Sequence, residues 1–158
     1  MARVRNLRSA GQGYWRGCAL AAALALTACA EKIEHDAVAA ARQAEAFAEI
    51  AFVRNDGERG YGLLAPATRR YVSLEQFKRT LSRLHPRALP KNLRALEYEL
   101  MKGEKALYIY LAGEHSGEHF YYRITLAGTA ATEYRVLTFE RANDPYPPSP
   151  GKQKLPSR

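Results

Sequence analysis

Cysteine is scarce in this 158-residue chain, and neither of its two cysteines lies in the part that is predicted to fold. Cys18 and Cys29 fall in or beside an N-terminal leader, which excludes a disulfide framework or a cysteine-ligated metal site for the rest. No apolar run reaches the roughly 20 residues that a membrane-spanning helix needs. The composition, 47% apolar and 25% charged, is that of one ordinary globular domain.

Acidic residues are missing from the first 28 residues, which hold Arg3, Arg5, Arg8 and Arg16. Those four account for half of the formal net charge of +8, and the rest of the chain has 20 basic and 16 acidic residues. A surplus of that size keeps a domain soluble and does not indicate a polyanion partner. No nucleic acid is therefore expected as a partner.

The leader is organised as an export signal. Residues 1–17 are basic, and residues 18–28 supply about ten apolar residues before charged residues end the run. The run closes with Leu26-Thr27-Ala28-Cys29, which resembles the lipobox of bacterial lipoproteins. That resemblance implies a lipoprotein signal peptide at 1–28, a diacylglycerol with fatty acyl chains such as palmitate on Cys29, and a lipidated N-terminus and linker at 29–35.

Two or three acyl chains hold a protein stably on a bilayer, whereas one gives marginal binding. We therefore expect a lipid-anchored protein of the bacterial cell envelope that faces the periplasm. The residue directly after the cysteine is Ala30 and not an aspartate. By analogy with known sorting rules, this points to the outer membrane. An alternative stays open, because Ala28-Cys29-Ala30 also fits a small-x-small cleavage site that would release a soluble product.

Helical patterns fill the first half of the exported part. Small apolar residues recur at spacings of three and four across residues 33–55, which predicts a helix with a small-residue face. A short second helix is predicted over residues 58–64, capped by Asp56 and ended by Pro66. A third begins after Ser73 and ends near residue 85. Ser73-x-x-Gln76 is a capping box that starts it, and proline at 86 limits it.

The hydrophobic period changes from 3.6 to 2 after residue 92, which predicts strands over 96–100, 107–111, 120–126 and 134–141. Two-residue turns at Gly103-Glu104 and Ser116-Gly117 both place the apolar side chains on one face. A slip of one residue in either hairpin would destroy that agreement. The predicted pairs are Leu100 with Leu107, Tyr98 with Ile109, Leu96 with Leu111, Leu111 with Tyr122, Ile109 with Ile124, and Leu107 with Leu126.

The C-terminal residues 142–158 hold five of the eight prolines and almost no core-forming residue. They are predicted to be a basic, extended or disordered tail.

Three N-terminal helices followed by a four-stranded antiparallel sheet make an α+β domain over residues 36–141. This order, with Asn55-Asp56-Gly57 ending the first helix and a Ser-x-Glu-Gln-Phe start at Ser73, resembles the nuclear transport factor 2-like superfamily of cone-shaped domains. Tyr134-Arg135-Val136 is similar to its last-strand pattern. The resemblance extends to small bacterial envelope lipoproteins and implies an α+β cone, a fold that hosts enzymes, ligand binders and interaction modules alike.

The inner sheet face has few groups with catalytic chemistry. Tyr98 and Tyr122 are the polar side chains expected there, and neither is obviously paired with a base. His85 before Pro86 is interpreted as a helix C-terminal residue, which is favourable there when charged, and not as a general base. His115 and His119 flank one hairpin turn with two glutamates, but they project to opposite faces, so no metal site and no cofactor are predicted.

The outer sheet face is the candidate interaction surface. Tyr108, Tyr110, Tyr121 and Arg123 gather there, with Tyr110 directly opposite Arg123, and tyrosine and arginine are enriched at protein interfaces. The alternative is that tyrosine simply favours strands. We therefore predict a non-catalytic binding or protein-interaction module, with a homodimer or another envelope protein as partner. A small hydrolase or isomerase that uses the cone cavity is the alternative, and a buried His–carboxylate pair would favour it.

Overall fold

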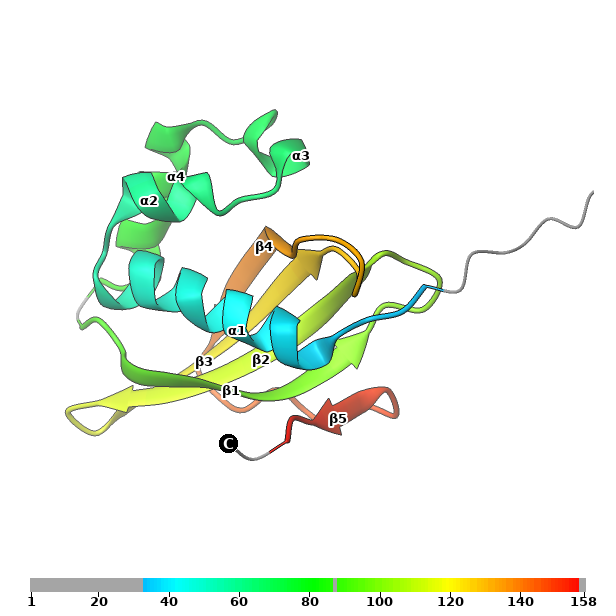
Figure 1. Cartoon of the computed structure of the whole chain (residues 1–158). Coiled ribbons are helices and arrows are strands. Elements are labelled where there is room, and N and C mark those ends of the chain that lie inside the picture. Colours follow the sequence, from blue (N-terminus) through cyan, green and yellow to red (C-terminus); the bar gives the residue numbers. More distant parts are fainter. Residues whose placement is uncertain (1–32, 87, 157–158) are drawn as a thin grey trace, which may run out of the picture. The chain divides into compact units, whose positions relative to one another are not determined.

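The computed structural model describes residues 33–86 and 88–156, in which four α-helices and one π-helical segment precede five strands. The helices lie on one face of an antiparallel sheet (Figure 1). The predicted α+β class is confirmed, but the predicted three helices and four strands are each one too few. The leader and Cys29 lie outside the described residues. The chain divides into two units between Glu31 and Lys32, inside the linker predicted at 29–35.

The alanine-rich first helix, α1 (Ala37–Ala48), runs directly into the π-helical segment η1 (Glu49–Val53). Asp36 caps α1 by accepting a hydrogen bond from the backbone N–H of Ala39 at 2.9 Å. The predicted small-residue face is buried, so the helix lies close to the strands. Its enclosed alanines are Ala40, Ala41, Ala44 and Ala48.

Two short helices follow, α2 (Gly57–Gly62) and α3 (Pro66–Arg69). The cap of α2 is as predicted, because the Asp56 carboxylate accepts from the backbone N–H of Arg59 at 3.0 Å. The prediction that Pro66 only ends a helix is incomplete, since it also begins α3. Proline is suited to a first helical position, where its missing N–H would have no partner in the helix anyway.

The helix α4 (Leu74–Leu84) begins and ends as predicted. The Gln76 side chain accepts from the Ser73 N–H at 2.8 Å, and the Ser73 hydroxyl accepts from the Gln76 N–H at 3.2 Å. This completes the capping box. His85 is the C-cap, and Pro86 follows it.

The sheet has the strand order β4-β3-β2-β1-β5. Its strands are β1 (Lys91–Leu100), β2 (Ala106–His115), β3 (Glu118–Ala127), β4 (Arg135–Ala142) and β5 (Lys152–Lys154).

The predicted register of the β2–β3 hairpin is confirmed along its whole length, including Ile109 opposite Ile124. Ser116 and Gly117 at its turn have φ values of 53° and 81°. Positive φ at both central residues is the signature of a type I′ turn, whose twist suits two-residue hairpins. The turn therefore specifies the register that the alternating pattern predicted.

The β1–β2 register is confirmed near its turn but wrong farther away. Tyr98 lies opposite Ile109 as predicted, whereas Ala95, and not Leu96, lies opposite Leu111. A bulge between Ala95 and Glu97 causes the shift. Leu96 is consequently 53% exposed instead of buried.

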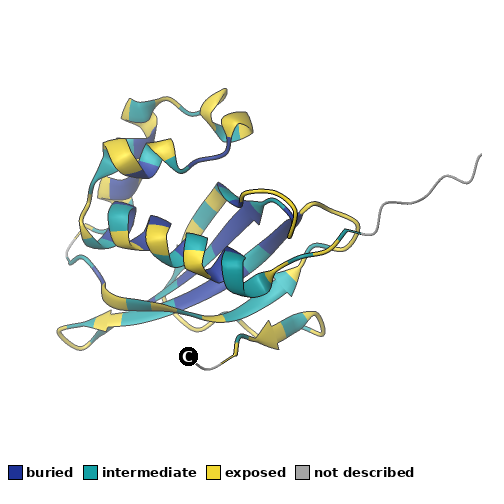
Figure 2. Ribbon diagram, in the orientation of Figure 1, coloured by how far each residue is buried: buried dark blue, intermediate teal, exposed yellow. Residues whose placement is uncertain are grey.

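The core lies between the helices and the inner face of β2 and β3, where Figure 2 shows continuous burial. Four phenylalanine rings fill the space between the layers, with neighbouring ring centroids 5.3 to 6.3 Å apart. The four rings belong to Phe47, Phe52, Phe77 and Phe139.

The prediction of a disordered tail at 142–158 is wrong for residues 143–156. This segment turns back and adds β5 antiparallel to β1, with Lys152 opposite Glu99 and Lys154 opposite Glu97 (Figure 1). The N–H of Leu155 also donates to the carbonyl oxygen of Leu96 at 2.9 Å. The tail therefore belongs to the domain.

Both outer strands of the four-stranded meander are engaged by other parts of the chain. At β4, the N–H of Ala65 donates to the Val136 carbonyl at 2.7 Å, and the N–H of Val136 donates to the Leu63 carbonyl at 3.2 Å. At β1, the Glu45 carboxylate accepts from the N–H of Ala95 at 2.9 Å, beyond the part that β5 covers.

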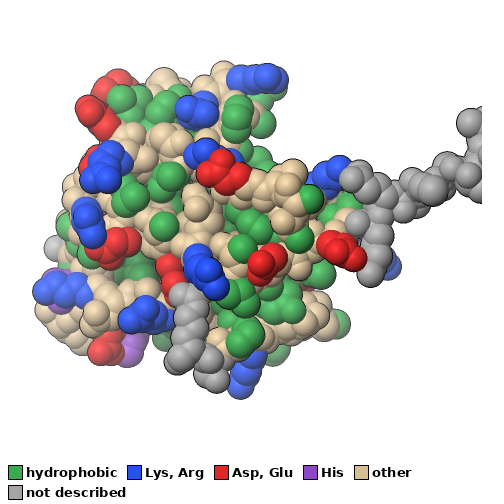
Figure 3. Space-filling view, in the orientation of Figure 1, with side chains coloured by type: hydrophobic (Ala, Val, Ile, Leu, Met, Phe, Trp, Pro, Cys, Tyr) green, Lys and Arg blue, Asp and Glu red, His purple; other side chains and the backbone are tan. Residues whose placement is uncertain are grey.

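Charged side chains surround the helical layer, and several basic ones have an acidic neighbour (Figure 3). Pairs among the described residues there include Arg54–Glu49, Arg59–Asp56 and Lys78–Glu58. No helix among the described residues is long and apolar enough to cross a membrane.

Candidate functional site

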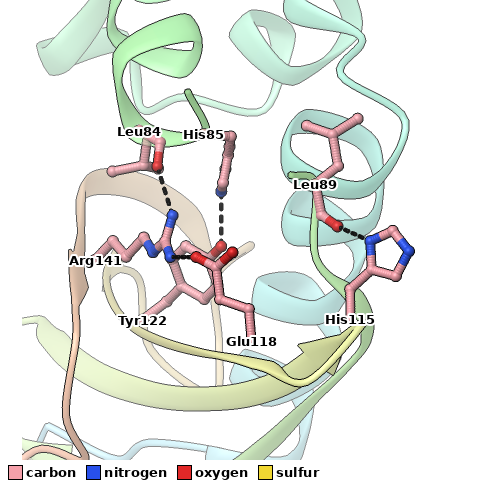
Figure 4. Close-up of polar contacts among 7 residues, drawn as sticks. All are labelled: Leu84, His85, Leu89, His115, Glu118, Tyr122 and Arg141. Atoms are coloured by element: carbon pink, nitrogen blue, oxygen red, sulfur yellow. Dashed lines mark hydrogen bonds and ion pairs between the residues drawn. The ribbon is translucent and has the colours of Figure 1, made fainter. Parts of the chain in front are cut away.

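A polar cluster lies where the end of α4 meets strands β3 and β4 (Figure 4). Nε2 of His85 and the hydroxyl oxygen of Tyr122 are 2.6 Å apart and share a hydrogen bond. Tyr122 is fully buried, and its ring stacks on Phe52 of η1 at 4.7 Å between centroids. The π-helical segment thus supplies one wall of the pocket that holds this pair.

Arg141 ties the three elements of the cluster together. Its guanidinium donates to the carbonyl oxygen of Leu84 at 2.9 Å and forms an ion pair with Glu118 (Figure 4). It also lies over the ring of Phe120, 4.4 Å from the centroid. Only 14% of the Arg141 side chain is exposed. A positive charge at the C-terminal end of α4 is favourable for the helix dipole.

The cluster keeps His85 neutral. Burial, and in second place the positive charge of Arg141, lower the pKa of His85 to about 4, while Glu118 opposes the change in part. Burial also raises the pKa of Tyr122 above its ordinary value. At neutral pH the bond therefore joins two uncharged groups, and His85 is a weak base with a pKa far from the one that suits proton transfer at that pH.

An open cleft of about 390 Å³ lies beside the cluster. Nδ1 of His85 and Nε of Arg141 are buried near it and have no hydrogen-bond partner among the described residues. The cleft can admit a small polar molecule. Its lining residues are Arg83, Leu84, Pro86, Glu118, Arg141 and Asn143.

Two predictions for the inner face are corrected here. His85 is at the helix C-terminus as expected, but its lowered pKa means that it is not charged there at neutral pH. Tyr122, expected to lack a basic partner, is paired with that histidine. Tyr98, the other tyrosine expected there, bonds through its hydroxyl to Gln153 of the tail at 2.6 Å.

The histidines of the hairpin turn are separated, as the alternation predicted. Nδ1 of His115 donates to the carbonyl oxygen of Leu89 at 2.8 Å (Figure 4), whereas His119 is exposed and lies beside Tyr121. Across residues 33–86 and 88–156, no group of three or more His, Cys, Asp or Glu side chains is placed to hold a metal ion.

The predicted interaction surface on the outer face is partly covered by the chain itself. Tyr110 is only 7% exposed, because Tyr146 of the tail packs against it at 5.3 Å between centroids. The Tyr110 hydroxyl donates to Glu99 at 2.7 Å. Burial, reinforced by Glu99, raises the pKa of Tyr110 to about 12. The expectation that Tyr110 is free to contact a partner is therefore wrong.

Arg123 lies opposite Tyr110 as predicted, but it too is engaged within the chain. It forms an ion pair with Glu140 at 2.6 Å and lies 4.8 Å from the ring centroid of Tyr108 and 5.6 Å from that of Tyr146. Arg123, which we expected to contact a partner, instead holds Tyr146 of the tail against the sheet.

Lys152 fastens the tail most firmly. Its side chain is 5% exposed, and its ammonium donates to the carbonyl oxygens of Tyr146 and Pro147 at 3.0 and 2.7 Å. The ammonium also lies 4.2 Å from the ring centroid of Tyr110 and 3.6 Å from a carboxylate oxygen of Glu97. Sequence reasoning missed this residue. The available signal was a tyrosine and a lysine embedded in a proline-rich run, since such runs dock readily on aromatic surfaces.

One part of the outer face stays open, next to the hairpin turn. Two hollows of about 80 and 350 Å³ share Leu96, Ala112 and Tyr121, so they form one groove, the outer groove. The bulge displays Leu96 at one wall, and small Ala112 leaves the space beside Tyr121 empty. The rings of His119 and Tyr121 are nearly parallel, at 24° and 6.4 Å, on the opposite wall.

Comparison of the chain with protein-family models, curated proteins and solved structures gives no match to any of the three.

Proposed function

We propose that this chain is a bacterial envelope lipoprotein, anchored through acyl groups on Cys29 and facing the periplasm, whose domain binds another envelope protein without catalysis. The leader and the lipobox-like Leu26-Thr27-Ala28-Cys29 support the anchor. The cap of α1 at Asp36 supports it too, because the domain begins seven residues after the anchored cysteine. The outer membrane remains the proposed location.

We also propose that the domain belongs to the nuclear transport factor 2-like superfamily. Its support is the order of elements, with helices first and an antiparallel meander afterwards. Because that fold hosts both enzymes and binding modules, it does not decide the function.

The observation that carries the binding proposal is the state of the inner cluster. His85 is bonded to a tyrosine and not to a carboxylate, and the nearby Glu118 is engaged by Arg141. A general base needs a pKa near the working pH and an orienting acid. His85 has neither, whereas the outer groove offers an exposed aliphatic side chain and an aromatic wall of the kind that anchors protein partners.

The anchor is tested by metabolic labelling with a fatty acid in a bacterial host that processes lipoproteins. The wild-type chain should be labelled and Cys29→Ala should not. Equal labelling of both, or of neither, would remove the lipoprotein part of the proposal.

Partner binding is tested by placing a photo-crosslinking amino acid at Leu96 or at Tyr121 in cells. Both positions line the outer groove, so both should give the same adduct. The exposed Ala131, in the loop between β3 and β4, is the control and should give none. An adduct of twice the monomer mass would identify a homodimer. No adduct at either groove position would show that the groove is not an interface.

A small hydrolase or isomerase is the second candidate, favoured by the buried His85–Tyr122 pair beside an open cleft. Tyr122→Phe removes the hydroxyl without emptying the aromatic site. Under the binding proposal it should leave both the groove adduct and the growth of a complemented deletion strain unchanged. Retained adduct with lost complementation would favour the enzyme.

A further inference from the structure

Two arginines and a tyrosine stand exposed where α3 ends, and we name Arg69, Arg70 and Tyr71 the basic corner. Tyr71 is 85% exposed, far more than Leu96 or any other large apolar side chain described. Both arginines are exposed, and no ion pair engages either of them within residues 33–86 and 88–156. Arg54, the C-cap of η1, and Arg59 of α2, by contrast, have acidic partners.

The backbone beneath these side chains is held in place. The Tyr61 hydroxyl donates to the carbonyl oxygen of Val72 at 2.8 Å, and the Thr68 hydroxyl donates to that of Leu137 at 2.8 Å. The corner is thus fixed both to α2 and to β4. An exposed aromatic ring on a fixed backbone loses little conformational entropy on contact with a surface.

The basic corner and the start of the folded domain are both attached near the beginning of β4. The N–H of Asp36 donates to the Tyr134 hydroxyl at 2.8 Å. The Thr68 hydroxyl donates to the carbonyl oxygen of Leu137, which is three residues after Tyr134. Three residues of extended chain span about 10 Å. In Figure 1, α3 is drawn over the N-terminal half of α1 and not over its C-terminal half, but it is not adjacent to the start of α1.

The tether to Cys29 is short. Asp36 is the seventh residue after Cys29, and seven residue steps of chain reach at most about 25 Å. If acyl groups on Cys29 enter a bilayer, the start of α1 stays within that distance of the headgroups. A domain held that close can turn so that the basic corner meets the same surface.

We propose that the basic corner docks on the phosphate headgroups of an anionic bilayer, the one into which Cys29 is inserted. The inference rests on the lipid anchor proposed above. A guanidinium group can donate two hydrogen bonds at once to the oxygens of a phosphate. Tyrosine is enriched at the membrane interface, where its apolar ring contacts lipid and its hydroxyl stays hydrated. Because the helices and the outer groove lie on opposite faces of the sheet, docking turns the outer groove away from the membrane and toward a partner.

The test uses the mature lipidated protein in vesicles, with Tyr71→Trp as a fluorescent reporter. The chain's single tryptophan, Trp15, lies in the leader, so the unsubstituted protein sets the background. In vesicles with about a quarter phosphatidylglycerol and brominated acyl chains, the reporter should be quenched, and added salt should relieve the quenching. Adding Arg69→Gln and Arg70→Gln should lower the ratio of docked to free protein by about 5-fold for each arginine.

Arg42→Gln with Arg79→Gln, in the same reporter background, is the matched control because it removes equal charge from exposed positions on α1 and α4. It should leave the quenching unchanged. Equal quenching in pure phosphatidylcholine, an equal effect of the control, or no quenching of a protein that carries the acyl label would each overturn the docking. The last result would leave the lipid anchor standing, whereas absence of the label would remove the anchor itself.

Discussion

Burial of a neutral histidine beside an arginine makes the stability of this domain depend on pH. The pKa of His85 is lowered to about 4 in the folded chain by burial first and by Arg141 second, while an unfolded histidine titrates near 6.5. Between those two values the unfolded chain binds more protons than the folded one. The free energy of unfolding contributed by His85 is therefore fully present above pH 6.5 and is lost as the pH falls toward 4.

The size of the effect follows from the same two pKa values. A difference of this size corresponds to about 3 kcal/mol at most. His85 keeps part of its surface in water, and screening there lowers the expected contribution to about 1–2 kcal/mol.

Urea unfolding of the purified protein near pH 7.5 and pH 4.5 measures the effect, with His85→Gln as the variant that cannot titrate. Carboxylates titrate alike in both proteins, so their share cancels in the comparison. The wild type should lose about 1–2 kcal/mol more than His85→Gln between the two pH values. His119→Gln, which removes an exposed histidine and keeps His85, should behave as the wild type does. An equal loss in wild type and His85→Gln would refute the reasoning.

Three further predictions concern packing and are read from urea melts. Ile109 is fully buried, so Ile109→Ala should lower the free energy of unfolding by roughly 2–5 kcal/mol, and Tyr108→Ala should lower it much less. Similar losses for the two variants would mean that the sheet faces are misassigned. Gly60→Ala places a Cβ 2.9 Å from a methyl group of η1 and should cost about 1–3 kcal/mol, whereas Gly62→Ala meets nothing within 4 Å and should be neutral or stabilising. Ser73→Ala removes the capping box of α4 and should cost about 0.5–2 kcal/mol, and an unchanged midpoint would show that the cap is dispensable.

Features specified by neighbouring residues were predictable from the sequence. The capping box at Ser73, the stop before Pro86 and the I′ turn at Ser116-Gly117 each depend on residues within a few positions of one another. The alternating pattern then settled which face of β2 and β3 is buried. The bulge at Leu96 was not predictable, because alternation alone cannot show where a strand gains an unpaired residue.

The candidate site depends on contacts between residues far apart in the chain. His85 and Tyr122 are 37 positions apart, and their meeting requires the direction in which α4 crosses the sheet. The tail was misjudged because few apolar residues were taken to mean disorder. Tyr146 and Lys152 suffice to order it, since Tyr110 provides an aromatic surface that they can both cover.

The engaged edges of the sheet limit how copies of this protein can associate. An unpaired strand edge is a template for another chain, and lipid-anchored molecules confined to a membrane meet one another often. Here the N–H of Ala65 and the carbonyl oxygen of Leu63 occupy the backbone groups of Val136 at β4, while β5 and the Glu45 carboxylate occupy much of β1. Pairing of strand edges between molecules would first have to displace these segments. Copies can therefore associate through their sheet faces, whereas fibre-like growth by edge-to-edge strand pairing is opposed by the chain itself.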